Sequence, residues 1–239
     1  MRWRRPRAGR SGSARARGDR VTDDEGDSPH APGYAAERFT AFSDAVVAIA
    51  ITLLILPLME SVGDISSTEG GTWRWLGDHH DQLVSFVLSF AIIAMFWVGN
   101  HRQFSRVQRV DAAVIWLMMA WLVTIVWLPV ATSITGAAGS GDPVAKSIYM
   151  GSMVVTSLLS LCTRLYLRQH PGLHDTPETA LIRGVGNDLS LAVLFSLALV
   201  ISLLFPAIGY YSLILMGANG VLERTITRVF LSRDGRVTG

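Results

Sequence analysis

The sequence has a single cysteine, few charged residues and no recognised enzyme motif. One thiol, at Cys162, excludes an intrachain disulfide and any redox or metal site built on paired cysteines. Charged residues make up only 17% of the 239 residues, whereas 50% are hydrophobic and the mean hydropathy is +0.36. A soluble domain of this size carries more charge, so the composition favours a membrane protein.

Catalytic and metal-binding signatures are also missing. The sequence contains no HExxH, no GxSxG and no glycine-rich phosphate-binding loop. The adjacent residues 79–81 (His-His-Asp) do not supply the three or four converging ligands that a metal site needs. His170 and His174 are separated by a Pro-Gly pair, which argues against a shared helical face. We predict no enzyme activity, no metal and no cofactor.

The N-terminal 36 residues are rich in Arg, Gly, Ser and Pro and poor in large apolar residues. They cannot bury enough apolar surface to offset the entropy of ordering, so we predict a disordered tail over 1–36. No apolar run resembling a signal peptide occurs in them. Their arginines could attract anionic lipid or RNA, or could simply keep this end in the cytoplasm. We favour the topology role and expect no nucleic-acid partner.

Six apolar segments follow, and each approaches the roughly 20 residues that a transmembrane helix needs. Their approximate limits are 39–59, 82–99, 112–134, 144–165, 185–205 and 207–222. The last is short and glycine-containing, so it is the least secure. We predict an all-α, polytopic membrane protein with a six-helix domain over 37–231 and a short C-terminal tail over 232–239.

The basic residues predict the orientation of these six segments. One set of connections and the two tails hold nearly all of the arginines, including Arg102, Arg106, Arg109, Arg164, Arg168 and Arg183. The opposite side holds only Arg74 and Lys146. Cytoplasmic loops are enriched in basic residues, so both termini are predicted to face the cytoplasm. An even number of spans agrees with this orientation.

The first helix, RFTAFSDAVVAIAITLLILPL over 38–58, is unusual because polar residues sit at one end of an apolar run. These residues are Arg38, Ser43 and Asp44. Ionisable groups at membrane depth are costly and are usually paired or functional. Alternatively, all three lie at the headgroup level and have no special role.

A helical wheel separates the polar end of this helix from an apolar stripe. One side carries Phe42, Ile49, Leu53 and Leu56. Asp44 falls on the opposite side, so it would point into the bundle if the stripe faces a pore. The other faces are equally apolar, so the pattern alone does not identify a pore. Thr52 lies beside the stripe, although a helical threonine commonly hydrogen-bonds a carbonyl of its own helix.

Residues 38–44, RFTAFSD, resemble the RxxxFSD motif of the transmembrane protein 175 potassium-channel family. Residues 96–102, FWVGNHR, resemble the FWxxHHR ending of that family's second helix. The likeness in motif covers the first two helices, and the likeness in hydropathy extends over about 36–231. Asn100 departs from the pattern, because it stands where the family usually has the first histidine of a pair.

This resemblance implies a homotetramer in which the first helices line a central pore without a carbonyl filter. The constriction would be a ring of Ile49, and the polar layer one turn further would be Thr52. Leu53 and Leu56 would extend the apolar lining. A tight apolar ring makes ions shed water and can close the path by dewetting.

The motif residues Arg38, Phe42, Ser43 and Asp44 would have a structural role in such a channel. Arg38, Ser43 and Asp44 would hold the pore helix by hydrogen bonds to neighbouring helices. His101 is a candidate partner for Asp44, because a buried carboxylate needs donors.

The resemblance therefore predicts a potassium-selective leak channel in the cell membrane, with K+ as the permeant ion and other copies of the chain as partners. A poorly selective cation or proton pathway is the alternative. A secondary transporter would need charges at mid-depth, and only Asp188 and Glu223 come close. A non-transporting membrane scaffold would show no flux.

Overall fold

The computed structural model describes residues 32–62, 71–138 and 142–205, and this part of the chain is α-helical. The helices are α1 (Pro32–Leu53), α2 (Leu56–Val62), α3 (Gly71–Asp78), α4 (His80–Phe104), α5 (Ala112–Ala138), α6 (Pro143–Gln169) and α7 (Glu178–Leu204), with a short 3₁₀ turn at Pro171–Leu173. Five stretches in the described part are long and apolar enough to cross a membrane, α1 and α2 counting together as one. The all-α, multi-pass architecture is thereby confirmed. The sixth predicted span, 207–222, lies outside the described residues, as do most of the N-terminal tail and the whole C-terminal tail.

The first predicted span forms a broken helix rather than a continuous one. α1 begins at Pro32, inside the tail predicted over 1–36, and proline suits the first turn of a helix because its missing N–H has no helical partner there. The break follows at Leu54 and Ile55, whose backbone N–H groups make long 3.3 Å bonds to carbonyls only three residues earlier. Pro57 causes this break, because it has no N–H to donate to the Leu53 carbonyl.

Aspartates define the starts of two membrane helices. Asp142 Oδ1 accepts a backbone N–H from the first turn of α6 at 2.8 Å, and Pro143 occupies the first helical position. Asp111 Oδ1 accepts the N–H of Val114 at 2.9 Å, while the Tyr166 hydroxyl of α6 donates to its Oδ2 at 2.6 Å. The hydrogen bond from Tyr166 is the main cause that holds the pKa of the Asp111 carboxyl below its usual value, and the one from Val114 acts in the same direction.

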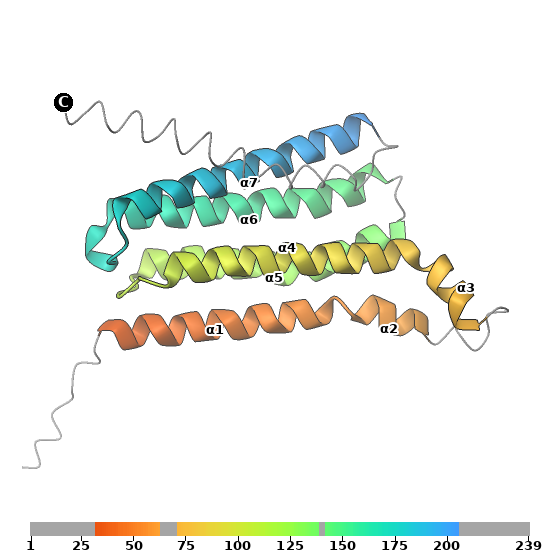
Figure 1. Cartoon of the computed structure of the whole chain (residues 1–239), viewed down its shortest axis with the longest axis horizontal. Coiled ribbons are helices and arrows are strands. Elements are labelled where there is room, and N and C mark those ends of the chain that lie inside the picture. The colour runs from red at the N-terminus through yellow and green to blue at the C-terminus, as the bar shows by residue number, and fades with distance from the viewer. Residues whose placement is uncertain (1–31, 63–70, 139–141, 206–239) are drawn as a thin grey trace, which may run out of the picture.

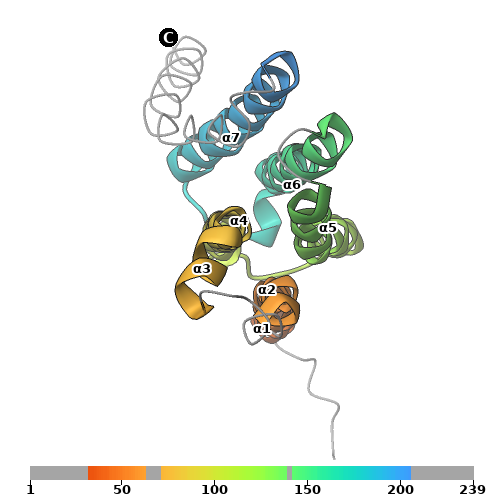
Figure 2. The same ribbon diagram turned by 90° about the vertical axis from the view of Figure 1, so that its right-hand side faces the viewer.

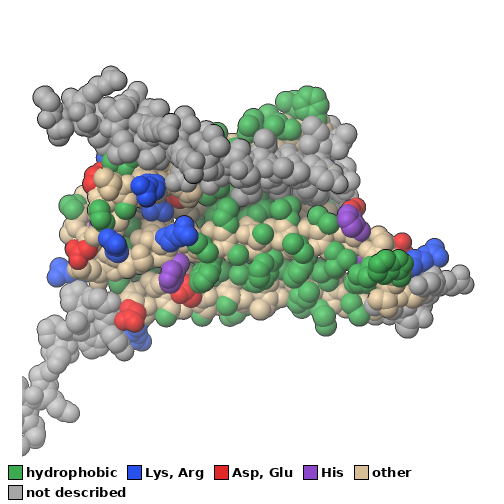
Figure 3. Space-filling model, viewed as in Figure 1, with side chains coloured by type: hydrophobic (Ala, Val, Ile, Leu, Met, Phe, Trp, Pro, Cys, Tyr) green, Lys and Arg blue, Asp and Glu red, His purple; other side chains and the backbone are tan. Residues whose placement is uncertain are grey.

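The spans run side by side, and the end view shows α1 set against α4 and α5 while α6 lies between α5 and α7 (Figures 1 and 2). At one end, the α4–α5 connection is tied to the α6–α7 connection. The N–H of Gln108 donates to the Leu173 carbonyl at 2.9 Å, and the N–H of Asp175 donates to the Arg106 carbonyl at 3.1 Å. Basic side chains gather at this end (Figure 3), which we call the basic end. Its arginines include Arg102, Arg106, Arg109, Arg168 and Arg183.

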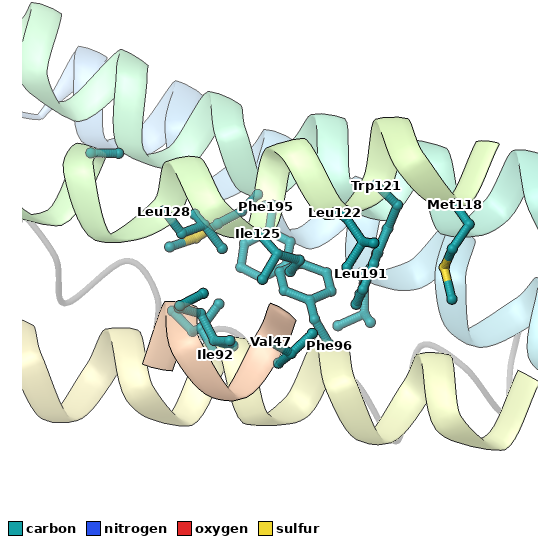
Figure 4. Close-up of a cluster of buried hydrophobic side chains, with 14 of the residues drawn as sticks. Val47, Ile92, Phe96, Met118, Trp121, Leu122, Ile125, Leu128, Leu191 and Phe195 are labelled. Atoms are coloured by element: carbon teal, nitrogen blue, oxygen red, sulfur yellow. The ribbon is translucent and has the colours of Figure 1, made fainter. Parts of the chain in front are cut away.

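The core is formed by residues of α1, α4, α5, α6 and α7, and Figure 4 shows part of it. Val47 of α1 packs into a cluster with α4 and α5, and the rings of Phe96 and Phe195 stack at 5.7 Å between α4 and α7. Lipid tails are as apolar as these side chains, so close packing and hydrogen bonds hold such helices together. Thr132 of α5 donates to Ser89 of α4 at 2.9 Å. Ser89 also shares a 2.8 Å hydrogen bond with the Tyr149 hydroxyl of α6.

Candidate functional site

The first helix has one face inside the bundle and one face outside it. The inner face carries Ser43, Val47, Ala50, Leu54 and Leu58, all of which are buried. The outer face carries Phe42, Ile49, Leu53, Leu56 and Met59, all of which are exposed. Ile49, at the middle of this apolar helix, is 60% exposed. The stripe predicted from the helical wheel is therefore largely exposed in the described part of the chain, and we call it the outer stripe.

Thr52 adds a polar atom beside the outer stripe. Its hydroxyl donates to the Ile49 carbonyl of its own helix at 2.8 Å, and its side chain is exposed. The proton is thus committed, but the oxygen keeps lone pairs that can accept from, or coordinate, a further group. Thr52 also lies directly before the break at Leu54 and Ile55. Just beyond it the Leu53 carbonyl has lost its helical donor, because Pro57 has no N–H.

Asp44 connects α1 to α4 at the inner side of the motif. The indole N–H of Trp97 donates to Asp44 Oδ1 at 2.8 Å, and His101 Nδ1 lies 4.0 Å from Asp44 Oδ2. The rings of Trp97 and His101 lie one helical turn apart, with centroids 5.7 Å from each other. The carboxylate therefore accepts from one donor and lies within ion-pair reach of a second, both on α4.

The other residues of the two motifs have different surroundings. Ser43 is buried against the bundle, whereas Arg38 is exposed at the basic end. Asn100 is buried and donates to the sulfur of Met118 in α5 at 3.3 Å, so it points away from Asp44. The structure brings Asp44 and His101 together as the sequence suggested.

Trp97 is the contact that sequence reasoning missed. It precedes His101 by four residues in the same motif, and residues four apart share a helical face. A partner proposed for Asp44 at His101 could have been extended to Trp97 on that ground. Trp97 supplies a neutral N–H, which remains a donor whether or not the histidine carries a proton.

Metal chemistry finds no support in the described ranges 32–62, 71–138 and 142–205. They contain no group of three or more His, Cys, Asp or Glu side chains that could hold an ion. His79, part of the His-His-Asp run, stacks on Trp75 at 4.7 Å and contacts the Trp75 carbonyl at 3.0 Å. This histidine therefore packs against Trp75 of α3.

The comparisons with known proteins all point to the same family. A family profile described as endosomal/lysosomal potassium channel TMEM175 matches residues 38–129, beginning at the first residue of the RxxxFSD motif. A protein named as a potassium channel from Streptomyces collinus is 37% identical over 124 residues, which cover 51% of this chain and 59% of that protein. A Mus musculus protein named as the endosomal/lysosomal proton channel TMEM175 is 34% identical over 113 residues, which cover 45% of this chain and 22% of that protein.

The fold comparison extends beyond the matched motifs. The crystal structure of a lysosomal potassium-selective channel TMEM175 homolog from Chamaesiphon minutus superposes with a TM-score of 0.60 at 25% identity. The aligned region covers 81% of this chain and 96% of that chain. The sequence match, in contrast, spans less than two thirds of the length of the Streptomyces and mouse relatives. These relatives are named as channels and not as enzymes, in agreement with the prediction of no enzyme activity.

Proposed function

The chain belongs to the TMEM175 family, and from that premise we propose that it is a potassium channel whose pore is lined by α1. The observation that carries the proposal is the outer stripe. An apolar face that begins next to the family motif is exposed, while the opposite face of the same helix is buried. In an assembly, such a stripe can meet its own copies around an axis.

One helix per subunit cannot enclose a conduit, so the proposal requires an oligomer, and we propose a homotetramer. Four copies of Ile49 would form the narrowest ring, with Leu53 and Leu56 extending the apolar lining. Thr52 would offer a ring of oxygen acceptors on the next turn, beside the break in α1. Potassium gives up hydration water more cheaply than sodium, which favours K+ in a tight apolar ring.

The remaining parts of the proposal concern placement in the membrane. The basic end would face the cytoplasm, because arginines are enriched on the cytoplasmic side of membrane proteins. The six-helix domain would span 37–231 in the cell membrane, with the tails 1–36 and 232–239 in the cytoplasm. The apolar segment 207–222 would provide the sixth span and return the chain to that side.

Ion flux through purified protein in liposomes tests the function directly. We expect K+ efflux that exceeds Na+ efflux under equal gradients. Equal K+ and Na+ fluxes, or a proton flux larger than both, would favour the alternative function, a poorly selective cation or proton pathway. Proton flux is measured as well because the mouse relative is named as a proton channel. Absence of any ion flux from correctly folded protein would overturn the channel proposal.

Replacing Asp44 by alanine is expected to reduce folded, assembled protein more than ion selectivity. The change leaves the Trp97 indole N–H without its 2.8 Å acceptor, and the loss of such a partly exposed hydrogen bond between α1 and α4 costs about 0.5–1.5 kcal/mol. Yield and oligomer fraction on size exclusion measure assembly, and the K+/Na+ flux ratio of the surviving oligomer measures selectivity.

Trp97→Phe is the matched control for Asp44→Ala. It keeps an aromatic ring but removes the N–H, so the same loss of assembly is expected with a smaller amplitude. A fully assembled Asp44→Ala oligomer that has lost selectivity would contradict the anchoring role and would place the carboxylate in the ion path.

A further inference from the structure

A cavity of about 340 Å³ lies between α4, α6 and α7, away from the outer stripe. Its wall on α4 is mostly small or apolar and includes Ala91, Ala94 and Val98. Leu191 of α7 continues that apolar lining. Toward the basic end the lining becomes polar, with Arg102, Asn187 and Ser160 among its residues. The cavity therefore has an apolar interior and a polar mouth.

The mouth is positively charged. Arg102 borders the cavity three residues after Gly99, and Arg183 lies one turn from Asn187 on the same side of α7. Both arginines are exposed, and neither makes an ion pair within the described part of the chain. The nearby Asp188 does not offset them, because Arg164 Nε already donates to its carboxylate at 2.6 Å.

The depth of the cavity fits a headgroup. Arg102 lies two residues before the end of α4, and Arg183 lies in the second turn of α7, so both side chains reach the level at which the spans end. Arginines at this level lie beside lipid phosphates, and basic clefts between helices on the cytoplasmic side are known to take anionic headgroups. Figure 3 shows basic side chains gathered at this end of the molecule.

We propose that this cleft binds an anionic phospholipid, independently of the pore. The phosphate would contact Arg102 and Arg183. One acyl chain would lie along the apolar wall formed by Ala94 and Leu191. Charge complementarity selects this occupant over an apolar helix, which would leave both guanidinium groups without a counterion at the mouth.

The experiment is native mass spectrometry of the full chain with phosphatidylglycerol and phosphatidylcholine offered in equal amounts. The intact protein is expected to retain phosphatidylglycerol preferentially. Changing Arg102→Gln together with Arg183→Gln should weaken that retention by roughly 25-fold, because each cation near a headgroup contributes roughly fivefold. The control removes two charges from the same end outside the cavity, as Arg106→Gln with Arg109→Gln, and should leave retention nearly unchanged.

A second variant blocks the space without altering charge. A side chain added at Gly99, which lines the cavity, would meet nothing within 4 Å at its Cβ, so Gly99→Leu can extend into the cavity without a backbone clash. It should lower phosphatidylglycerol retention in a protein that stays folded. Equal losses in the Arg106/Arg109 control would reduce the effect to general surface charge and overturn the site. The absence of any preference for phosphatidylglycerol in the intact protein would also overturn the site.

Discussion

Replacing Asp188 by alanine is expected to destabilise the protein by about 3–5 kcal/mol, because it strands a buried guanidinium. Asp188 is only 4% exposed, and its Oδ2 accepts from Arg164 Nε at 2.6 Å. Arg164 also donates to Gln103 Oε1 at 3.4 Å, so the pair joins α6 and α7 and reaches α4. Thermal unfolding followed by size exclusion should show a large drop in midpoint and in recovered oligomer.

The double change Arg164→Met with Asp188→Leu separates the cost of stranding one charge from the net contribution of the ion pair to stability. Removing both charges leaves no stranded ion, and apolar replacements of similar volume are commonly neutral or stabilising. We therefore expect the double variant to unfold much closer to the intact protein than Asp188→Ala does. A double variant as unstable as the single one would mean that the stability comes from packing or from other hydrogen bonds, not from charge pairing.

Gly184 provides an independent check of the same contact. A Cβ at this position would overlap Arg164 Nη1, so Gly184→Ala must displace the guanidinium from its place. We expect a loss in the same direction as Asp188→Ala. Gly151→Ala is the matched control on α6, because a Cβ there meets nothing within 4 Å. Similar losses at both glycines would point to backbone effects instead of the ion pair.

The spans themselves could be predicted from the sequence because a bilayer forces backbone groups to bond within each segment. Hydropathy locates the lipid-crossing part of a helix and not its ends. α7 begins at Glu178, seven residues before the predicted start at 185, and the extra two turns contain Gly184. The break in α1 was also readable in principle, since Pro57 marks the place where a helical hydrogen bond must be lost.

The contacts between helices were harder to predict. Arg164 and Asp188 are 24 residues apart on different helices, and only the packing of α6 on α7 brings them together. The side of α1 that carries Asp44 was predictable from the helical period, which sets it opposite the outer stripe. Its donor at Trp97 could be reached only by extending the partner proposed at His101 one turn back along the same helix, because a motif records which residues occur and not which of them reach a given carboxylate.

Replacing Ile49 by asparagine is expected to reduce the K+/Na+ permeability ratio by about tenfold, which corresponds to about 1.4 kcal/mol. Four amides in the proposed ring would wet it and would offer oxygen partners to a partly hydrated sodium ion. A hydrogen bond to a charged partner contributes a net amount of this order, about 1.5–3 kcal/mol. Reversal potentials or competitive liposome fluxes measure the ratio, and Ile49→Leu, which keeps the ring apolar, should retain most of it.

The control for this variant places the same amide at an exposed position on another helix, so that an effect on membrane insertion can be separated from an effect on the ion path. Val193→Asn places the same amide at an exposed, mid-helix β-branched position on α7, where 46% of the side chain is accessible. An effect of polarity on membrane insertion would appear in both variants, whereas an effect on the ion path would appear only at position 49. If Ile49→Asn assembles normally with an unchanged permeability ratio, the outer stripe does not form the constriction. The conduit would then have to be sought on another helix, while the anchoring of α1 through Asp44 and Trp97 would stand.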